Sequence, residues 1–243
     1  MPQDFLIVIP ARYASSRFPG KPLSDINGKS MLQRVWDKCV EASAGDKVVI
    51  ATDDEKIELH CKELNMNVIQ TSTKCLTGTD RVAEVAKKIN ADFYINVQGD
   101  EPLIMPSDIK KVINTYIKSP GQCICGMAKI TSKKDFYNPN IPKVVTSKDN
   151  KLLYITRAAV PTSKTLEFSK ANKQVCIYAF TPESLKEYGV GTLKEANEEI
   201  EDIEILRLLE KGYKVSMVKV SDSSIAVDTP EDLDKVKKYL NEL

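Results

Sequence analysis

One short segment near the N-terminus gathers side chains that suit phosphate binding. The segment Ile9 to Lys21 contains two arginines, two serines and one lysine: Arg12, Ser15, Ser16, Arg17 and Lys21. A nucleoside triphosphate carries several negative charges, to which arginine offers planar paired donors and lysine a compact charge. The segment follows the apolar run Phe5 to Ile9, which is typical of a buried strand. The pattern favours a phosphate-binding loop over a solvated turn with scattered charges.

Two aspartates follow or precede predicted elements at places where a carboxylate could hold Mg²⁺. Asp100 stands in the segment Asn96 to Pro102, directly after the apolar run Asp92 to Val97, and Asp228 stands just before the last predicted helix. Mg²⁺ prefers oxygen ligands together with substrate phosphates. Each residue has a structural alternative. Asp100 could belong to a polar turn, and Asp228 could be a helix N-cap unless Thr229 serves as the cap.

The segment Thr77 to Arg81 predicts a tight turn that leads into a helix. Thr79 or Asp80 suits the N-cap of that helix, because both side chains can accept a hydrogen bond from a free backbone N–H group. The same turn could instead form a loop that binds a nucleotide base. The residues alone leave both interpretations open.

Several other kinds of site are excluded by the motifs. The segment Gly28 to Ser30 resembles the end of a Walker A loop, but Leu23 occupies the position where that motif needs a glycine, and no G-x-G-x-x-G is present. Ser30 is better interpreted as a helix cap. The single histidine, His60, and the absence of a cysteine cluster argue against a zinc site or a Ser-His-Asp triad. The chemistry must then rest on carboxylates, lysine, arginine and backbone amides.

The bulk properties are those of an ordinary globular protein of one large domain. The chain has 243 residues, of which 42% are hydrophobic and 28% are charged, and its formal net charge is +1. Such a balance gives no broad attraction to nucleic acid or to an anionic membrane. No apolar run approaches the length of a membrane span, and the six cysteines form no CxxC pair. We therefore expect a cytoplasmic protein with reduced thiols.

Apolar runs and helical stripes alternate through the first half of the chain. Strands are predicted at Phe5 to Ile9, Lys47 to Ala51, Asn67 to Gln70 and Asp92 to Val97. Helices are predicted at Ser30 to Ala42, Glu55 to Leu64, Asp80 to Ile89 and Ser107 to Ile117. Repeated βα units imply a three-layer α/β/α fold with a mostly parallel sheet. Ligands bind outside the carboxyl ends of such strands, so we expect the loops after Ile9, Ala51 and Val97 to converge.

The second half is less regular. Strands are predicted at Cys123 to Thr131, Lys143 to Thr146, Leu152 to Ile155, Gln174 to Phe180 and Lys214 to Val220. Helices are predicted at Glu198 to Glu210 and Pro230 to Leu240, the second with proline at an early position. The segments Asp135 to Pro142 and Pro161 to Lys173 are the best candidates for excursions from the main fold.

Taken together, the motifs resemble those of the CMP-Kdo synthetases, the 3-deoxy-manno-octulosonate cytidylyltransferases. The matching stretches run from Ile9 to Leu233 and read IPARYASSRFPGKPL, VVIATDDEKI, TGTDRVAEV, INVQGDEPLI, NPNIPKVV, LLYITRAAVP, IYAF and VDTPEDL. The resemblance implies the nucleotide-diphospho-sugar transferase-like fold, with residues 1–243 as a single domain. It also implies a homodimer, in which a smaller subregion of residues 121–180 contributes to the acceptor pocket and the dimer interface.

The resemblance further implies a role for each matching residue. CTP would be held at its phosphates by Arg12, Ser15, Arg17 and Lys21, and at its base by Ala11, Gly78, Thr79 and Arg81, with Gln98 nearby. Asp100 and Asp228 would ligate Mg²⁺ and, with Lys21 and Arg12, form the catalytic set. The small acidic sugar would contact Gln98, Arg157, Gln174, Tyr178 and Glu201. The C2 hydroxyl of a 2-keto sugar acid would attack the α-phosphate of CTP and release pyrophosphate.

The chain departs from the family pattern on the acceptor side. The family usually has His-x-Gly-Ile-Tyr where this chain has the segment Gln174 to Tyr178, with Gln174 for the histidine and Cys176 for the glycine. Since glutamine cannot carry the charge of histidine, the acceptor could be Kdo, an amino-substituted relative, another nonulosonate or a phosphonate. A catalytically silent nucleotide-binding protein is a further alternative. The pathway, whether lipopolysaccharide, capsule or another glycoconjugate, stays open.

Overall fold

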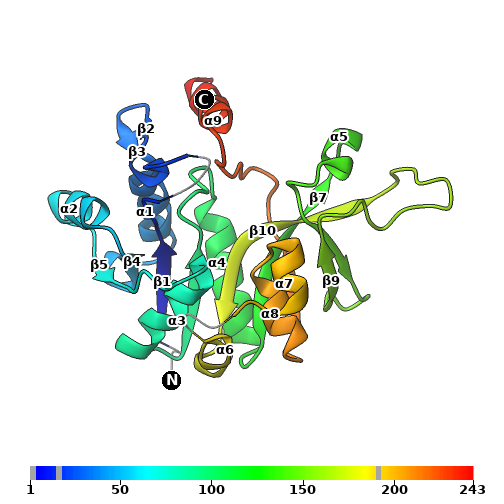
Figure 1. Ribbon diagram of the computed structural model, residues 1–243, viewed down its shortest axis with the longest axis horizontal. Helices are drawn as coiled ribbons and strands as arrows, with labels where there is room; N and C mark the ends of the chain where they lie inside the picture. Colours follow the sequence, from blue (N-terminus) through cyan, green and yellow to red (C-terminus); the bar gives the residue numbers. More distant parts are fainter. Residues whose placement is uncertain (1–3, 15–17, 190–192, 243) are drawn as a thin grey trace.

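The structure, a computed structural model, describes residues 4–14, 18–189 and 193–242 (Figure 1). A nine-stranded sheet runs through the centre, with strands in the order β11-β7-β10-β6-β1-β4-β5 along its main path. The four N-terminal strands of this path are parallel: β1 (Phe5–Pro10), β4 (Val48–Thr52), β5 (Val68–Gln70) and β6 (Phe93–Val97). The predicted three-layer fold with a mostly parallel sheet is confirmed.

One strand interrupts the parallel order. β10 (Ala171–Phe180) lies between β6 and β7 (Cys123–Ile130) and is antiparallel to both, while β11 (Val215–Lys219) pairs parallel to β7. The start of β10 also pairs with β8 (Lys143–Thr146), which pairs in turn with β9 (Leu152–Thr156). Residues 157–170, here called the arm, connect β9 to β10 and project sideways from the body in Figure 1.

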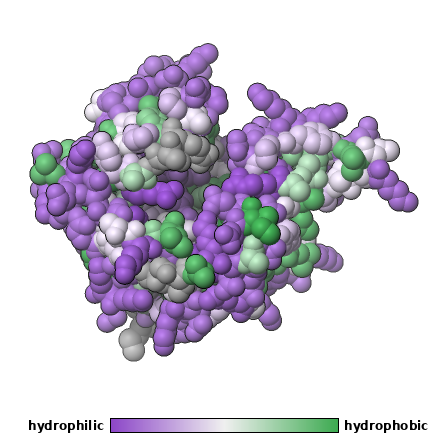
Figure 2. All heavy atoms as spheres, in the orientation of Figure 1, coloured by the Kyte–Doolittle hydropathy of each residue, from purple (hydrophilic) through white to green (hydrophobic). Residues whose placement is uncertain are grey.

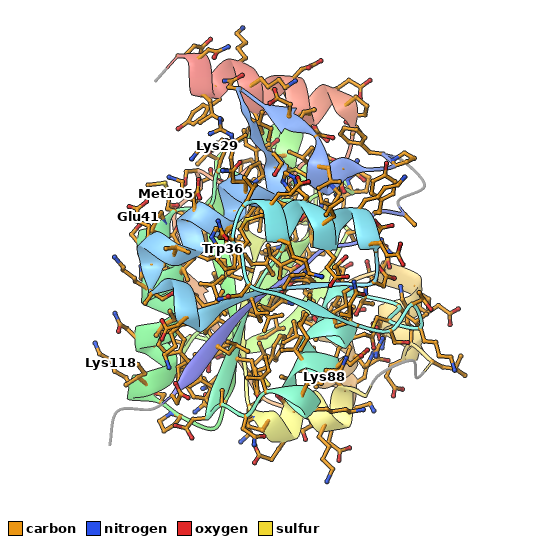
Figure 3. The ribbon with its side chains drawn as sticks, turned by 90° about the vertical axis from the view of Figure 1, so that its left-hand side faces the viewer. Lys29, Trp36, Glu41, Lys88, Met105 and Lys118 are labelled. Atoms are coloured by element: carbon orange, nitrogen blue, oxygen red, sulfur yellow. The ribbon has the colours of Figure 1, made fainter. Side chains whose placement is uncertain are left out.

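Alternating burial along the strands explains the two helical layers. In β1, Ile7 and Ile9 face one core while Leu6 and Val8 face the other. The first core is covered by α1 (Met31–Ala42), α2 (Glu55–Glu63) and α4 (Pro106–Lys118). The second is covered by α3 (Gly78–Lys88), α6 (Pro182–Tyr188) and α8 (Ile205–Glu210). In Figure 3, Lys118 at the end of α4 and Lys88 at the end of α3 lie on opposite sides of β1.

A third, smaller core fixes the C-terminal helix. α9 (Pro230–Asn241) packs beside the hairpin of β2 (Asp25–Ile26) and β3 (Lys29–Ser30), and it lies above the sheet in Figure 1. The buried side chains of this third core are Ile26, Met31, Leu103, Val227, Leu233 and Val236. This core places the residues just before α9 over the end of β6, because Val227 N–H donates to the carbonyl of Asp100 at 2.9 Å.

The predicted helix Glu198 to Glu210 is wrong as a single element. It is two helices, α7 (Ala196–Glu201) and α8, separated at Asp202, whose left-handed φ of 49° breaks the helical repeat. Aspartate tolerates this conformation better than most residues do. Four short helices were also not predicted: the 3-10 turns Lys21–Leu23 and Gly45–Lys47, α5 (Lys133–Tyr137) and α6. Among the described residues, no helix is both long and apolar enough to cross a membrane.

Candidate active site

A cavity of about 810 Å³ opens at the carboxyl ends of β1 and β6, where the α/β topology predicts a ligand site. Its wall also includes the start of α3, the middle of β10, α5 and the segment before α9. Figure 2 shows the hollow on this side of the molecule, between the part that carries α9 and the part that carries the arm. Predicted site residues that line the cavity are Ala11, Arg12, Lys21, Gly78, Arg81, Gln98, Asp100, Arg157, Gln174, Tyr178 and Asp228.

Lys21 lies between the two aspartates predicted to ligate a metal. Its Nζ is 2.8 Å from Asp100 Oδ2 and 3.6 Å from Asp228 Oδ1, and it donates to the carbonyl of Val227 at 2.7 Å. The lysine side chain is only 14% exposed. Gly20 makes this position reachable, because its φ of +72° turns the chain directly before Lys21.

Asp228 is not the cap of the following helix. Thr229 caps α9 by accepting from the backbone N–H of Asp232, whose side chain accepts in return from Thr229 N–H. The alternative in which Thr229 serves as the cap is confirmed, so the Asp228 carboxylate is directed to Lys21 instead.

The carboxylate pair suits a hard divalent cation. Asp100 and Asp228 already share one positive charge, the ammonium of Lys21, and both offer oxygen donors. Within the described ranges, no group of three or more His, Cys, Asp or Glu side chains could hold a metal ion. A cation held by these two residues would therefore need substrate oxygens to complete its coordination, as Mg²⁺ with a bound triphosphate does.

The start of α3 approaches the loops after β1 and β6 very closely. Thr77 caps α3 in a reciprocal pair with Asp80, a cap that differs from the predicted Thr79 or Asp80. A Cβ atom on Gly78 would come within 2.8 Å of Gln98 Oε1 and 3.1 Å of Pro10 Cγ. A side chain at this position would force the Gln98 amide to turn away and would crowd the Pro10 ring, so glycine keeps this end of the cavity open.

Two residues predicted to read the base have other partners. Arg81 is 3% exposed; its guanidinium pairs with Asp53 Oδ2 at 2.8 Å and donates to Thr71 Oγ1 at 2.8 Å. Thr79 is also buried, and both its N–H and its hydroxyl donate to Glu204 Oε2, at 2.9 Å and 2.5 Å. Arg81 still borders the cavity, whereas the structure does not bring Thr79 to its wall.

A buried charge network behind α3 was missed by sequence reasoning. Arg207 is fully buried and pairs with Glu198 Oε2 at 2.6 Å and with Asp80 Oδ1 at 3.1 Å. Glu204, one turn earlier, accepts from Gly78 N–H at 3.1 Å; burial raises the pKa of its carboxyl group. These contacts fix the start of α3 against α8. The one signal in the sequence was an arginine within the otherwise apolar run Ile205 to Leu209.

At the other end of the cavity, β10 carries the residues that depart from the family pattern. Gln174 Nε2 donates to the hydroxyl of Tyr178 at 2.9 Å, so the two predicted substrate residues contact each other. Cys176 lies between them in an irregular stretch of β10, where the register against β7 shifts between Val175 and Tyr178. Burial raises the pKa values of the Cys176 thiol and the Tyr178 hydroxyl, so both groups are neutral at pH 7.

Arg157 and Glu201 hold each other and the backbone. Arg157 donates through Nε, Nη1 and Nη2 to the carbonyl groups of Glu201, Pro139 and Asp202, at 2.5, 3.0 and 3.1 Å. The Glu201 carboxylate accepts from Thr156 Oγ1 at 2.5 Å and from Arg157 N–H at 2.9 Å. Arg157 lines the cavity, but the structure does not bring Glu201 to its wall. The pair braces the turn between α7 and α8 against β9.

Glu101 also lines the cavity, although it was assigned no role from the sequence. It is 4% exposed, directly follows Asp100 and accepts a hydrogen bond from Ser224 Oγ. Burial raises the pKa of its carboxyl group to about 7, and the nearby charge of Lys173 acts in the opposite direction. Two further predicted phosphate ligands, Ser15 and Arg17, lie outside the described residues.

Comparison with known proteins decides the family. Residues 6–220 match the Cytidylyltransferase family. The 3-deoxy-manno-octulosonate cytidylyltransferase of Protochlamydia amoebophila is 37% identical, covering 96% of this chain and 93% of the relative, and that of Aliivibrio fischeri strain MJ11 is 40% identical over 98% and 99%. The chain belongs to the 3-deoxy-manno-octulosonate cytidylyltransferase family. The resemblance inferred from the motifs is thereby confirmed, and the protein is a CTP-dependent nucleotidyltransferase.

Solved structures agree with the family assignment. A CMP:2-keto-3-deoxy-manno-octonic acid synthetase in complex with CTP superposes with a TM-score of 0.91 at 36% identity, covering 98% of this chain and 99% of that one. A cytidylyltransferase from Leptospira borgpetersenii superposes with a TM-score of 0.67 at 18% identity, covering 99% and 88%. The second likeness shows only that the fold is shared.

Proposed function

We propose that the protein transfers CMP from CTP to the C2 hydroxyl of 3-deoxy-manno-octulosonate or a close relative, with release of pyrophosphate. The observation that carries this proposal is the cluster of Lys21 with Asp100 and Asp228 at the mouth of the cavity. In phosphoryl and nucleotidyl transfer, catalysis comes mainly from alignment of the reactants and neutralisation of phosphate charge. A lysine between two carboxylates supplies both a phosphate partner and a place for a cation.

CTP is proposed to lie with its base toward α3 and its phosphates toward Lys21. Gly78 and Gln98 close one end of the cavity, and the backbone at Ala11 lies beside them. Arg12 is exposed at the wall and available to phosphate oxygens. Ser15 and Arg17 complete the proposed phosphate set. Because the guanidinium of Arg81 is engaged by Asp53, we propose that Arg81 and Thr79 act on the base through the position of α3.

Mg²⁺ is the proposed cation of Asp100 and Asp228. When bound, it would neutralise charge on the triphosphate and on the attacking oxygen. Asp100 and Asp228 would hold it from the protein side, and Lys21, released from them, would turn to the phosphates. This arrangement predicts that chelation of divalent metal abolishes activity and that added Mg²⁺ restores it.

The acceptor is proposed to bind between β10 and the end of β6. Gln174 and Tyr178 offer an amide and a hydroxyl there, both uncharged, while Arg157 and Glu201 would shape this end of the cavity from behind. Such a wall suits hydroxyl groups of a sugar.

The deciding experiment is a pyrophosphate-release assay with CTP, Mg²⁺ and a panel of acids: Kdo, an amino-substituted Kdo, another nonulosonate and a phosphonate. Release with Kdo supports the proposal. Release only with another acid would move the activity to that acceptor. CTP binding by calorimetry without release with any acid would instead favour a silent nucleotide-binding protein.

We also propose a cytoplasmic homodimer, with residues 121–180 at its interface. Leu153 in β9 is 58% exposed and Leu166 in the arm is 68% exposed, although both are apolar. All six cysteines are free, which fits a reducing compartment. Analytical ultracentrifugation tests the dimer, and Leu153→Glu is expected to shift it toward monomer.

A further inference from the structure

The acidic acceptor needs a positive partner that the proposed nucleotide site does not already use. Six of the cationic side chains that line the cavity are held by other groups, assigned to the phosphates or exposed on outer helices. Lys21 is held by Asp100 and Val227, Arg81 by Asp53, and Arg157 by three carbonyl groups. Arg12 is assigned to the phosphates in the proposed site, and Lys134 and Lys235 are exposed on α5 and α9. A seventh cation, Lys173, remains.

Lys173 lies on β10, directly before Gln174, and is mostly buried with 20% of its side chain exposed. Its ammonium pairs with Oδ1 of Asp222, in the segment that connects β11 to α9. Asp222 is 45% exposed, so water can take over the solvation of its carboxylate if the lysine turns away. An ion pair with one well-solvated member holds its partner only weakly. Lys173 can therefore change partners at low cost.

The chemistry of the acceptor fixes where its carboxylate must lie. In a cyclic 2-keto sugar acid the carboxylate is bonded to C2, the same carbon that carries the attacking hydroxyl. The cation that holds it must accordingly stand beside the reacting centre. Lys173 meets this condition, since it lines the cavity from β10 directly before Gln174, which is proposed to contact the sugar. Lys134, on the outlying α5, is placed at the rim.

We propose that Lys173 binds the carboxylate of the sugar acid, exchanging Asp222 for the substrate. This inference rests on the proposed function and adds to it a positive anchor from β10. The anchor would orient C2 so that its hydroxyl points to the α-phosphate, while Gln174 and Tyr178 contact the rest of the sugar. No bond is made or broken by Lys173.

The test compares Lys173→Gln with Lys134→Gln, which removes a charge at the rim of the same cavity. In Lys173→Gln we expect the KM for the sugar acid to rise about 10- to 100-fold, because a hydrogen bond between charged groups is lost. The KM for CTP should change less than twofold. Lys134→Gln should leave both values near those of the parent. Lys173→Arg should recover part of the loss, and Lys173→Met keeps the apolar stem if the glutamine variant folds poorly.

A second measurement separates anchoring from a structural role. The parent should prefer the free acid to its methyl ester, and Lys173→Gln should lose that preference; an undiminished preference would overturn the proposal. Asp222→Asn should lower the KM for the acid, whereas a loss of activity equal to that of Lys173→Gln would mean that the ion pair is only structural. Calorimetry of acid binding with CMP present gives the same comparison without turnover. Failure of the parent to release pyrophosphate would count against the proposed function alone.

Discussion

The ammonium of Lys21 lies 2.8 Å from Oδ2 of Asp100, across 79 positions of the chain. The contact joins the loop after β1 to the loop after β6, and Asp228 reaches the same ammonium from the start of α9. Three segments that are remote in sequence thus meet at one charge.

Lys21→Ala should lower kcat by about 10²- to 10³-fold, the usual effect of removing one hydrogen-bond donor to the transition state. The measurement is steady-state pyrophosphate release with both substrates saturating. Lys29→Ala is the matched control, since Lys29 makes an exposed ion pair with Asp37 far from the cavity wall. An unchanged rate in Lys21→Ala would exclude the proposed phosphate contact.

Asp228→Asn and Thr229→Ala should separate activity from stability. Asp228→Asn is expected to lower kcat by about 100-fold or more, because a cation ligand is lost, while Tm stays nearly unchanged. Thr229→Ala removes the cap of α9, which costs about 1 kcal/mol in the free energy of unfolding, while most of the turnover remains. That cost corresponds to a fall in Tm of about 2–4 °C. Equal turnover in Asp228→Asn and the parent would refute the metal assignment.

Arg207→Leu should destabilise the protein strongly. The substitution leaves Asp80 and Glu198 buried without their positive partner, which typically costs about 3–5 kcal/mol in the free energy of unfolding. Urea unfolding followed by circular dichroism measures it. Lys62→Ala, which breaks an ion pair at the surface with Glu58, is the control and should leave the same free energy nearly unchanged. A loss below about 1 kcal/mol in Arg207→Leu would show that the network is dispensable.

The six thiols should be inert in the folded protein at pH 8. Burial raises the pKa values of all of them, to about 12 for Cys61, Cys75 and Cys125. Only the thiolate reacts with iodoacetamide, so labelling counted by mass spectrometry should be slow without guanidinium and fast with it. The buried thiols also make the stability of the fold depend on pH. Because their folded pKa values exceed the unfolded value near 9, their contribution to the free energy of unfolding is complete below pH 9 and declines as pH rises toward 12. Rapid labelling of Cys75 at pH 8 would contradict the burial described here.

The main elements could be predicted because long, regular patterns encode them. The apolar runs of β1 and β6 and the helical stripe of α1 are each long enough to show their period. α5 and α6 have five and seven residues, too few to display one. The break at Asp202 accompanies long-range contacts such as the hydrogen bond from Arg207 in α8 to Asp80 in α3, which a local pattern does not contain.

The site was predictable where it follows from topology. Lys21, Asp100 and Gly78 stand just after strands or at the start of a helix, and the parallel sheet brings such positions together. Glu204 and Lys173 could not be found in this way. Their partners, Gly78 and Asp222, lie far away in sequence, so neither contact is contained in a local pattern.

The place of β10 in the sheet has a consequence for synthesis of the protein. β6 and β7 are made long before β10, yet they are separated by it, and both neighbours of β7 come later in the chain. On the ribosome, the four parallel strands can assemble from the emerging N-terminal part, whereas β7 must wait for β10 and β11. The nucleotide end of the cavity thus has its framework before the acceptor end exists. A truncated nascent chain would lack the acceptor end of the cavity, and the edge of β6 that pairs with β10 would be uncovered.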